Sequence, residues 1–109
     1  MPDNFQIMLD VYKSAVKEVL GNAYVQMVVY GSYARGDYRK DSDLDVFILA
    51  DMRPEELSRY SGKIYDLAYD IGEEFQVEIN PVIQSKEVYE HWKQTYPFFI
   101  NISKEGVAV

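Results

Sequence analysis

The sequence contains no cysteine, one histidine and fewer basic than acidic residues. Without cysteine there can be no disulfide, thiolate nucleophile or thiolate metal site, and one histidine excludes a histidine-rich metal site within one chain. Eleven Lys and Arg against eighteen Asp and Glu give a net charge of −7, which disfavours direct nucleic-acid binding because an acidic surface repels a polyanion. No apolar run approaches the roughly 20 residues of a membrane span. The N-terminus lacks a basic segment followed by an apolar one, so we expect a cytoplasmic protein with no membrane association.

What remains is the composition of one small globular domain, expected to span residues 1–109. Hydrophobic residues make up 48% of the sequence and charged residues 27%, enough for a single modest core. Pro81 lacks a backbone N–H and therefore suits the edge of a sheet. Apolar spacing predicts helices over residues 3–20, 54–72 and 85–94, a short helix near 98–102, and strands over 25–30, 43–50 and 75–83. This order predicts an α/β sheet domain with helices packed on the sheet.

The stretch from residue 25 to residue 50 holds the residues that point to chemistry. Its first strand is broken by Gly31-Ser32, and its second strand places Asp43 and Asp45 on one side because successive side chains alternate. Glycine lets backbone N–H groups approach a phosphate, and serine can donate to one at a helix start. Two carboxylates are hard oxygen ligands suited to Mg²⁺. The stretch predicts a metal site facing a phosphate cradle; two ordinary solvent-facing aspartates would leave this spacing unexplained.

Two further groups of polar residues have alternative interpretations. Arg35, Arg39 and Lys40 lie beside the turn, where they either contact the phosphates of a nucleotide or form part of a solvated loop. His91 lies in a polar helical stretch and is interpreted as a surface residue rather than a catalytic base.

The motif Gly-Ser-Tyr-Ala-Arg-Gly at residues 31–36, followed after five residues by Ser-Asp-Leu-Asp at 42–45, resembles the signature of the DNA-polymerase-β-type nucleotidyltransferases. It most resembles their minimal, single-domain branch. The resemblance implies the nucleotidyltransferase fold, an α+β arrangement with a mixed sheet. It also implies ATP as substrate, two Mg²⁺ ions on Asp43 and Asp45, and contacts from Gly31, Ser32 and Arg35 to the nucleotide.

The family also uses a third carboxylate from a later strand, and Glu78 is the candidate for this catalytic and metal-binding position. Glu78 lies on the polar side of the predicted strand 75–83. Aspartate is commoner there in the family, so Glu78 departs from the pattern. Its additional methylene moves the carboxylate oxygens, and alignment of reacting groups governs rate.

The same resemblance implies a partner and a biological setting. Minimal nucleotidyltransferases are commonly encoded beside a helical HEPN-type ribonuclease toxin, and act as its antitoxin by transferring AMP from ATP to a toxin tyrosine. One alternative is a regulatory subunit that binds metal and nucleotide without transfer, which the Glu78 departure favours. Another is an aminoglycoside-type nucleotidyltransferase, although the sequence shows no room for an acceptor domain. The sequence leaves the nucleobase, the acceptor and the oligomeric state open.

Overall fold

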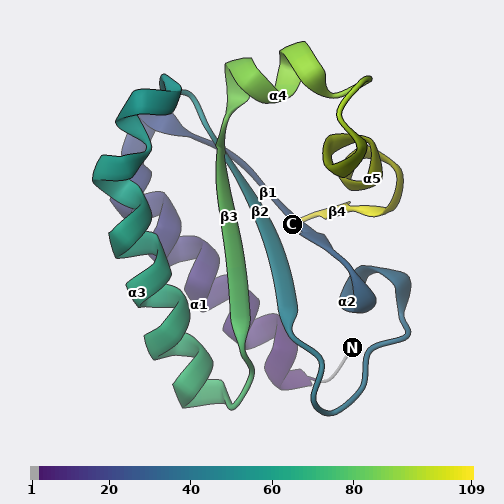
Figure 1. The fold of residues 1–109 in the computed structure, drawn as a ribbon. Helices are drawn as coiled ribbons and strands as arrows, with labels where there is room; N and C mark the ends of the chain where they lie inside the picture. The colour runs from purple at the N-terminus through teal and green to yellow at the C-terminus, as the bar shows by residue number, and fades with distance from the viewer. Residues whose placement is uncertain (1–2) are drawn as a thin grey trace.

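The fold is that of a computed structural model, which describes residues 3–109. The elements follow one another as α1 (Asp3–Leu20), β1 (Tyr24–Tyr30), α2 (Ser32–Arg35), β2 (Leu44–Ala50), α3 (Ser58–Phe75), β3 (Ile79–Ser85), α4 (Lys86–Trp92), α5 (Pro97–Glu105) and β4 (Val107–Ala108) (Figure 1). Short 3₁₀ turns at Gly21–Ala23 and Pro54–Glu56 follow α1 and precede α3. The predicted first helix is confirmed over its whole length.

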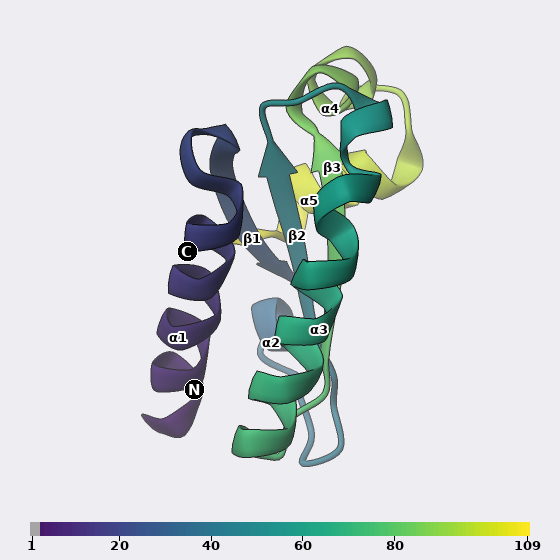
Figure 2. The ribbon, with the colours of Figure 1, turned by 90° about the vertical axis from the view of Figure 1, so that its left-hand side faces the viewer.

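The four strands of the described chain form one mixed sheet in the order β3-β2-β1-β4. β2 pairs parallel with β3 and antiparallel with β1, and β1 pairs antiparallel with β4. Helices α1 and α3 lie side by side on one face, and α5 lies on the other (Figures 1 and 2). The predicted sheet domain with packed helices is therefore confirmed.

The alternation of β2 assigns its side chains to two separate cores. Leu44, Val46, Ile48 and Ala50 are buried with residues of α1 and α3, on what we call the α1–α3 face. The intervening apolar residues are buried against α5, on what we call the α5 face: Phe47 and Leu49 pack there with Val28, Phe99 and Ile102. Because a strand period of two separates these sets, Asp45 must lie on the α5 face beside Phe47.

The predicted strand over 75–83 is wrong in its first part. α3 continues through Phe75, Gln76 ends it in a left-handed conformation with φ of 59°, and the strand runs from Ile79 to Ser85. Gly72 therefore does not end the helix. A Cβ on Gly72 would overlap the carbonyl oxygen of Val77, so glycine here allows the chain leaving α3 to turn back closely against it.

The C-terminal third differs from the prediction in two further ways. The predicted third helix ends at Trp92, whose side chain is exposed rather than packed. The final residues form strand β4, which was not predicted because a strand of two residues is too short to show an alternating pattern. The edge position predicted for Pro81 is confirmed, since β3 borders the sheet. Within residues 3–109, no helix is long and apolar enough to cross a membrane.

Candidate active site

A row of polar side chains crosses three strands at the open end of the α5 face. Asp45 on β2 stands opposite Tyr30 on β1 and opposite Asn80 on β3. Directly opposed residues project from the same side of a sheet. Asp43 comes just before β2 and accepts a hydrogen bond from the Asn80 amide, Nδ2 to Oδ2 at 3.1 Å. The parallel register of β2 and β3 thus places a polar group beside each aspartate.

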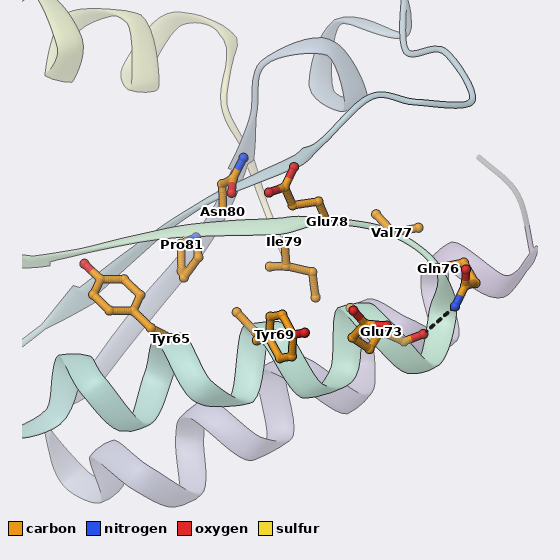
Figure 3. A pocket seen from close by; sticks show the side chains of 11 residues that line it. Tyr65, Tyr69, Glu73, Gln76, Val77, Glu78, Ile79, Asn80 and Pro81 are labelled. Carbon is orange, nitrogen blue, oxygen red and sulfur yellow. Dashed lines mark hydrogen bonds between the residues drawn. The ribbon is translucent and has the colours of Figure 1, made fainter.

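The same register brings Glu78 to the aspartates. The backbone N–H of Leu44 donates to the carbonyl oxygen of Glu78 at 2.8 Å, which extends the strand pairing by one step beyond β3. In Figure 3, Glu78 and Asn80 point away from α3, whereas Ile79 points toward it. The structure therefore brings Glu78, the carboxylate that departs from the family pattern, next to Asp43, which in turn lies near Asp45.

The electrostatics of this group are those of crowded carboxylates. A side-chain hydrogen bond with Asp43 and the negative charge of Asp43 both raise the pKa of Glu78. Burial and the charge of Asp43 raise the pKa of Asp45, an effect opposed by the Asn80 amide and the Arg35 guanidinium. Since like charges raise each other's carboxyl pKa, the site favours binding of a cation.

The donor chemistry fits Mg²⁺. Among residues 3–109, no three His, Asp or Glu side chains are already gathered as a metal cage. Mg²⁺ does not need one, because it binds one or two carboxylates and completes its octahedron with substrate phosphates and water. Asp43 and Asp45 would supply those two carboxylates, and such an ion would relieve their mutual repulsion.

The Gly31-Ser32 turn lies directly against this group. Gly31 has φ of 74° and ψ of −151°, a conformation restricted to glycine, and a Cβ at this position would overlap Oδ2 of Asp45. α2 begins at Ser32, and the N–H groups of a first helical turn have no partner within the helix. The two halves of the motif, separated in sequence, therefore form one site.

Arg35 lies at the rim of the site rather than inside it. Its guanidinium contacts Asp37, Nε to Oδ2 at 3.4 Å, and Glu105, Nη1 to Oε1 at 3.5 Å. All three side chains are substantially exposed, and exposed ion pairs contribute about 1 kcal/mol or less. Arg35 can therefore exchange these partners for a phosphate at little cost. Arg39 and Lys40 are exposed in the loop before β2.

Sequence reasoning did not single out Asn80, Tyr30 and Glu105. Asn80 was detectable in principle, because it follows Glu78 by two residues on the same alternating face. Burial and the nearby Asp45 charge raise the pKa of Tyr30 to about 12, so its hydroxyl stays protonated beside the carboxylates. Glu105 contacts Arg35 although the two are 70 residues apart in the sequence, so no local sequence pattern predicts this contact.

Replacing Gly31 by alanine should destabilise the protein by about 1–3 kcal/mol, because alanine cannot adopt this backbone without strain. It should also displace Asp45 and weaken triphosphate binding. Urea denaturation and calorimetry would measure the two effects. Gly62→Ala is the matched control: Gly62 lies in α3 with open space around its Cα, so alanine should add about 0.5–1 kcal/mol of stability and leave binding unchanged. Unchanged triphosphate binding in Gly31→Ala would show that the turn does not hold phosphate.

Comparison with known proteins identifies the family of this chain. Residues 9–105 match the family model described as a nucleotidyltransferase domain. Two proteins of Methanocaldococcus jannaschii, named as candidate protein adenylyltransferases, are similar to this chain. One is 28% identical over 95 residues, covering 87% of each chain, and the other is 31% identical over 77 residues, covering 71% of this chain and 76% of the relative.

Two crystal structures share the fold. One is a toxin–antitoxin with AMP-PNP, with a TM-score of 0.57 and 14% identity over 91% of this chain and 70% of the other. The second is a mutant of the toxin–antitoxin MntA-HpeT, with a TM-score of 0.57 and 13% identity over 93% and 70%. At these identities the likeness concerns the fold alone. The family match and the curated relatives establish that this chain belongs to the nucleotidyltransferase domain family and is a nucleotidyltransferase.

Proposed function

We propose that this protein transfers AMP from ATP to a hydroxyl of a partner protein, namely a tyrosine of a HEPN-type helical ribonuclease toxin, and so acts as an antitoxin. The observation that carries the proposal is the contact of the Gly31-Ser32 turn with Asp45, beside Asp43 and Glu78. Relatives named as candidate protein adenylyltransferases support a protein acceptor. Toxin–antitoxin structures of the same fold, one of them with AMP-PNP, support the partner and the nucleotide.

In this proposal the turn and α2 hold the triphosphate. Backbone N–H groups following Gly31 and the hydroxyl of Ser32 donate to phosphate oxygens. Arg35 exchanges its exposed carboxylate partners for a phosphate. Because the turn contacts Asp45, a triphosphate held there lies next to the aspartates, and its orientation is restricted before the acceptor arrives.

Asp43, Asp45 and Glu78 are the proposed Mg²⁺ ligands, for one or two ions. When bound, Mg²⁺ would neutralise phosphate charge and stabilise the attacking and leaving oxygens. The Asn80 amide holds Asp43 in place through its hydrogen bond. Together these side chains keep the reacting phosphorus on the open end of the α5 face.

The acceptor approaches from the β3 edge, where Glu78 is exposed. There the hydroxyl oxygen bonds to the α-phosphorus of ATP, the bond from that phosphorus to the β-phosphate oxygen breaks, and pyrophosphate leaves. Tyrosine has an unperturbed pKa of about 10, so its proton must be accepted as the bond forms, and we assign this role to Glu78, which is exposed at that edge. On the α3 side of the same edge, a pocket of about 530 Å³ with the exposed Tyr65 and Tyr69 in its wall (Figure 3) gives the partner protein a place to dock.

The charge of the chain supports a basic partner. At −7 the protein attracts positively charged surfaces and repels nucleic acid. The exposed edge strand β3 leaves the site accessible to a docking protein. The acceptor hydroxyl is accordingly assigned to a protein rather than to RNA.

The test is to incubate the protein with ATP, Mg²⁺ and the HEPN-type product of a neighbouring gene, and to measure intact masses. We expect the partner to gain one or more AMP units and to lose ribonuclease activity. Omitting Mg²⁺ should prevent the gain. Label that accumulates on RNA or on an aminoglycoside, and never on the partner, would overturn the proposal.

A further inference from the structure

A second cavity lies on the α5 face, at the edge of the core and outside the carboxylate group. Its volume is about 550 Å³, in the range of small-ligand sites. Two of its residues, Trp92 and Tyr96, are 48% and 52% exposed, although large aromatic side chains gain most from burial. We call this cavity the aromatic pocket; its walls include Val82, Gln84, Trp92, Tyr96, Phe98 and Phe99.

The floor of the aromatic pocket continues the strand that carries the site. Val82 follows Asn80 by two residues on β3, so both side chains lie on the α5 face, about 7 Å apart along the strand. Val82 is paired with Phe47, just as Asn80 is paired with Asp45. A ribose ring spans a separation of this size between phosphate and base.

One wall of the aromatic pocket also touches the site. The ring of Phe98 packs edge-on against Tyr30, with centroids 5.5 Å apart, and Tyr30 is the register partner of Asp45. Phe98 therefore lies between the carboxylate group and the pocket. Two independent contacts, one along β3 and one through α5, thus connect the pocket to the place proposed for the phosphates.

Building on the proposed function, we infer that the aromatic pocket binds the nucleobase of the triphosphate substrate. With the phosphates at Gly31-Ser32 and the ribose over Asn80, the base lies against Trp92, Tyr96 and Phe98. Every base has a π face that stacks on aromatic rings. The side-chain oxygen of Gln84 accepts the N–H of Ser85 at 2.8 Å, which leaves its NH₂ group to donate to an acceptor on the base.

The chain supplies its own probe for this inference, because Trp92 is its single tryptophan. Titrations with ATP and with inorganic tripolyphosphate, each with Mg²⁺, separate the base from the phosphates. We expect ATP to bind more tightly than tripolyphosphate and to change Trp92 fluorescence, whereas tripolyphosphate binds without that change. Loss of one stacking partner weakens binding roughly 5- to 150-fold.

Variants give the decisive comparison by calorimetry. Trp92→Leu and Tyr96→Leu should each weaken ATP binding at least about fivefold and leave tripolyphosphate binding unchanged. Ile7→Ala is the control, since Ile7 is an apolar residue that is 55% exposed on α1 and lies outside both pockets. Equal affinities for ATP and tripolyphosphate would overturn this inference alone. So would pocket variants that weaken binding of the partner protein but leave ATP binding unchanged. Failure of both ligands to bind would overturn the proposed function as well.

Discussion

Replacing Asp43 and Asp45 together by asparagine should abolish Mg²⁺-dependent triphosphate binding and lower AMP transfer on the order of a thousandfold or more. Asparagine keeps the size of both side chains and removes both negative charges, so a divalent cation loses its two protein carboxylates. Calorimetry with and without Mg²⁺ measures binding, and intact mass measures transfer.

Asp41→Asn is the matched control for this double variant. Asp41 is exposed in the same loop, so its replacement changes the local charge without changing the carboxylate group. It should bind and transfer like the original protein. Equal ATP binding with and without Mg²⁺ in the original protein, or persistence of its Mg²⁺ dependence in the double variant, would contradict the metal assignment.

The double variant should also be more stable than the original protein at neutral pH. Folding raises the pKa of Asp45 above its ordinary value of 3.8, so the folded state binds the proton more tightly than the unfolded state, and ionisation costs stability. This loss of stability is absent below pH 3.8 and develops as the pH rises from 3.8 through the raised pKa of Asp45. Urea denaturation at several pH values should show the advantage of the variant growing over this window; a variant that is less stable at neutral pH would refute the repulsion.

Glu78→Gln should reduce transfer on the order of a hundredfold or more while ATP affinity changes little. Glutamine has the same size, and the backbone carbonyl that accepts from Leu44 is unchanged, so the arrangement of β2 and β3 is preserved. What disappears is a charge that acts on the acceptor, and loss of an interaction made only in the transition state lowers turnover rather than ground-state binding. Initial rates from intact mass and affinities from calorimetry measure the two quantities.

Two further variants sharpen the test of Glu78. Glu74→Gln is the control, because Glu74 is an exposed carboxylate on α3 outside the site. Glu78→Asp should raise transfer by restoring the geometry common in the family. Unchanged transfer in Glu78→Gln would mean that another residue activates the acceptor. Normal ATP binding without any transfer by the original protein would favour the regulatory subunit instead.

The sequence by itself determined the features that depend on local chemistry. The alternation over residues 43–50 puts Asp43 and Asp45 on one side of the strand because a strand has a period of two. In the structure Asp45 indeed lies on the side opposite Leu44, Val46 and Ile48, which are buried on the α1–α3 face. Gly31 could be interpreted locally as well, because a glycine followed by serine at a helix start is a phosphate-binding pattern.

Tertiary structure decided which distant residues meet. The parallel register of β2 and β3 places Asn80 and Glu78 beside the aspartates, and register depends on the packing of whole strands rather than on either sequence segment. The end of α3 was misplaced because Gly72 suggested a helix stop, whereas its lack of a Cβ serves a contact with Val77. β4 and the aromatic pocket were not predicted for the same reason. Each exists only because the C-terminal segment folds back over the sheet. This long-range contact is stabilised by packing, and the residues that make it show no periodic sequence pattern.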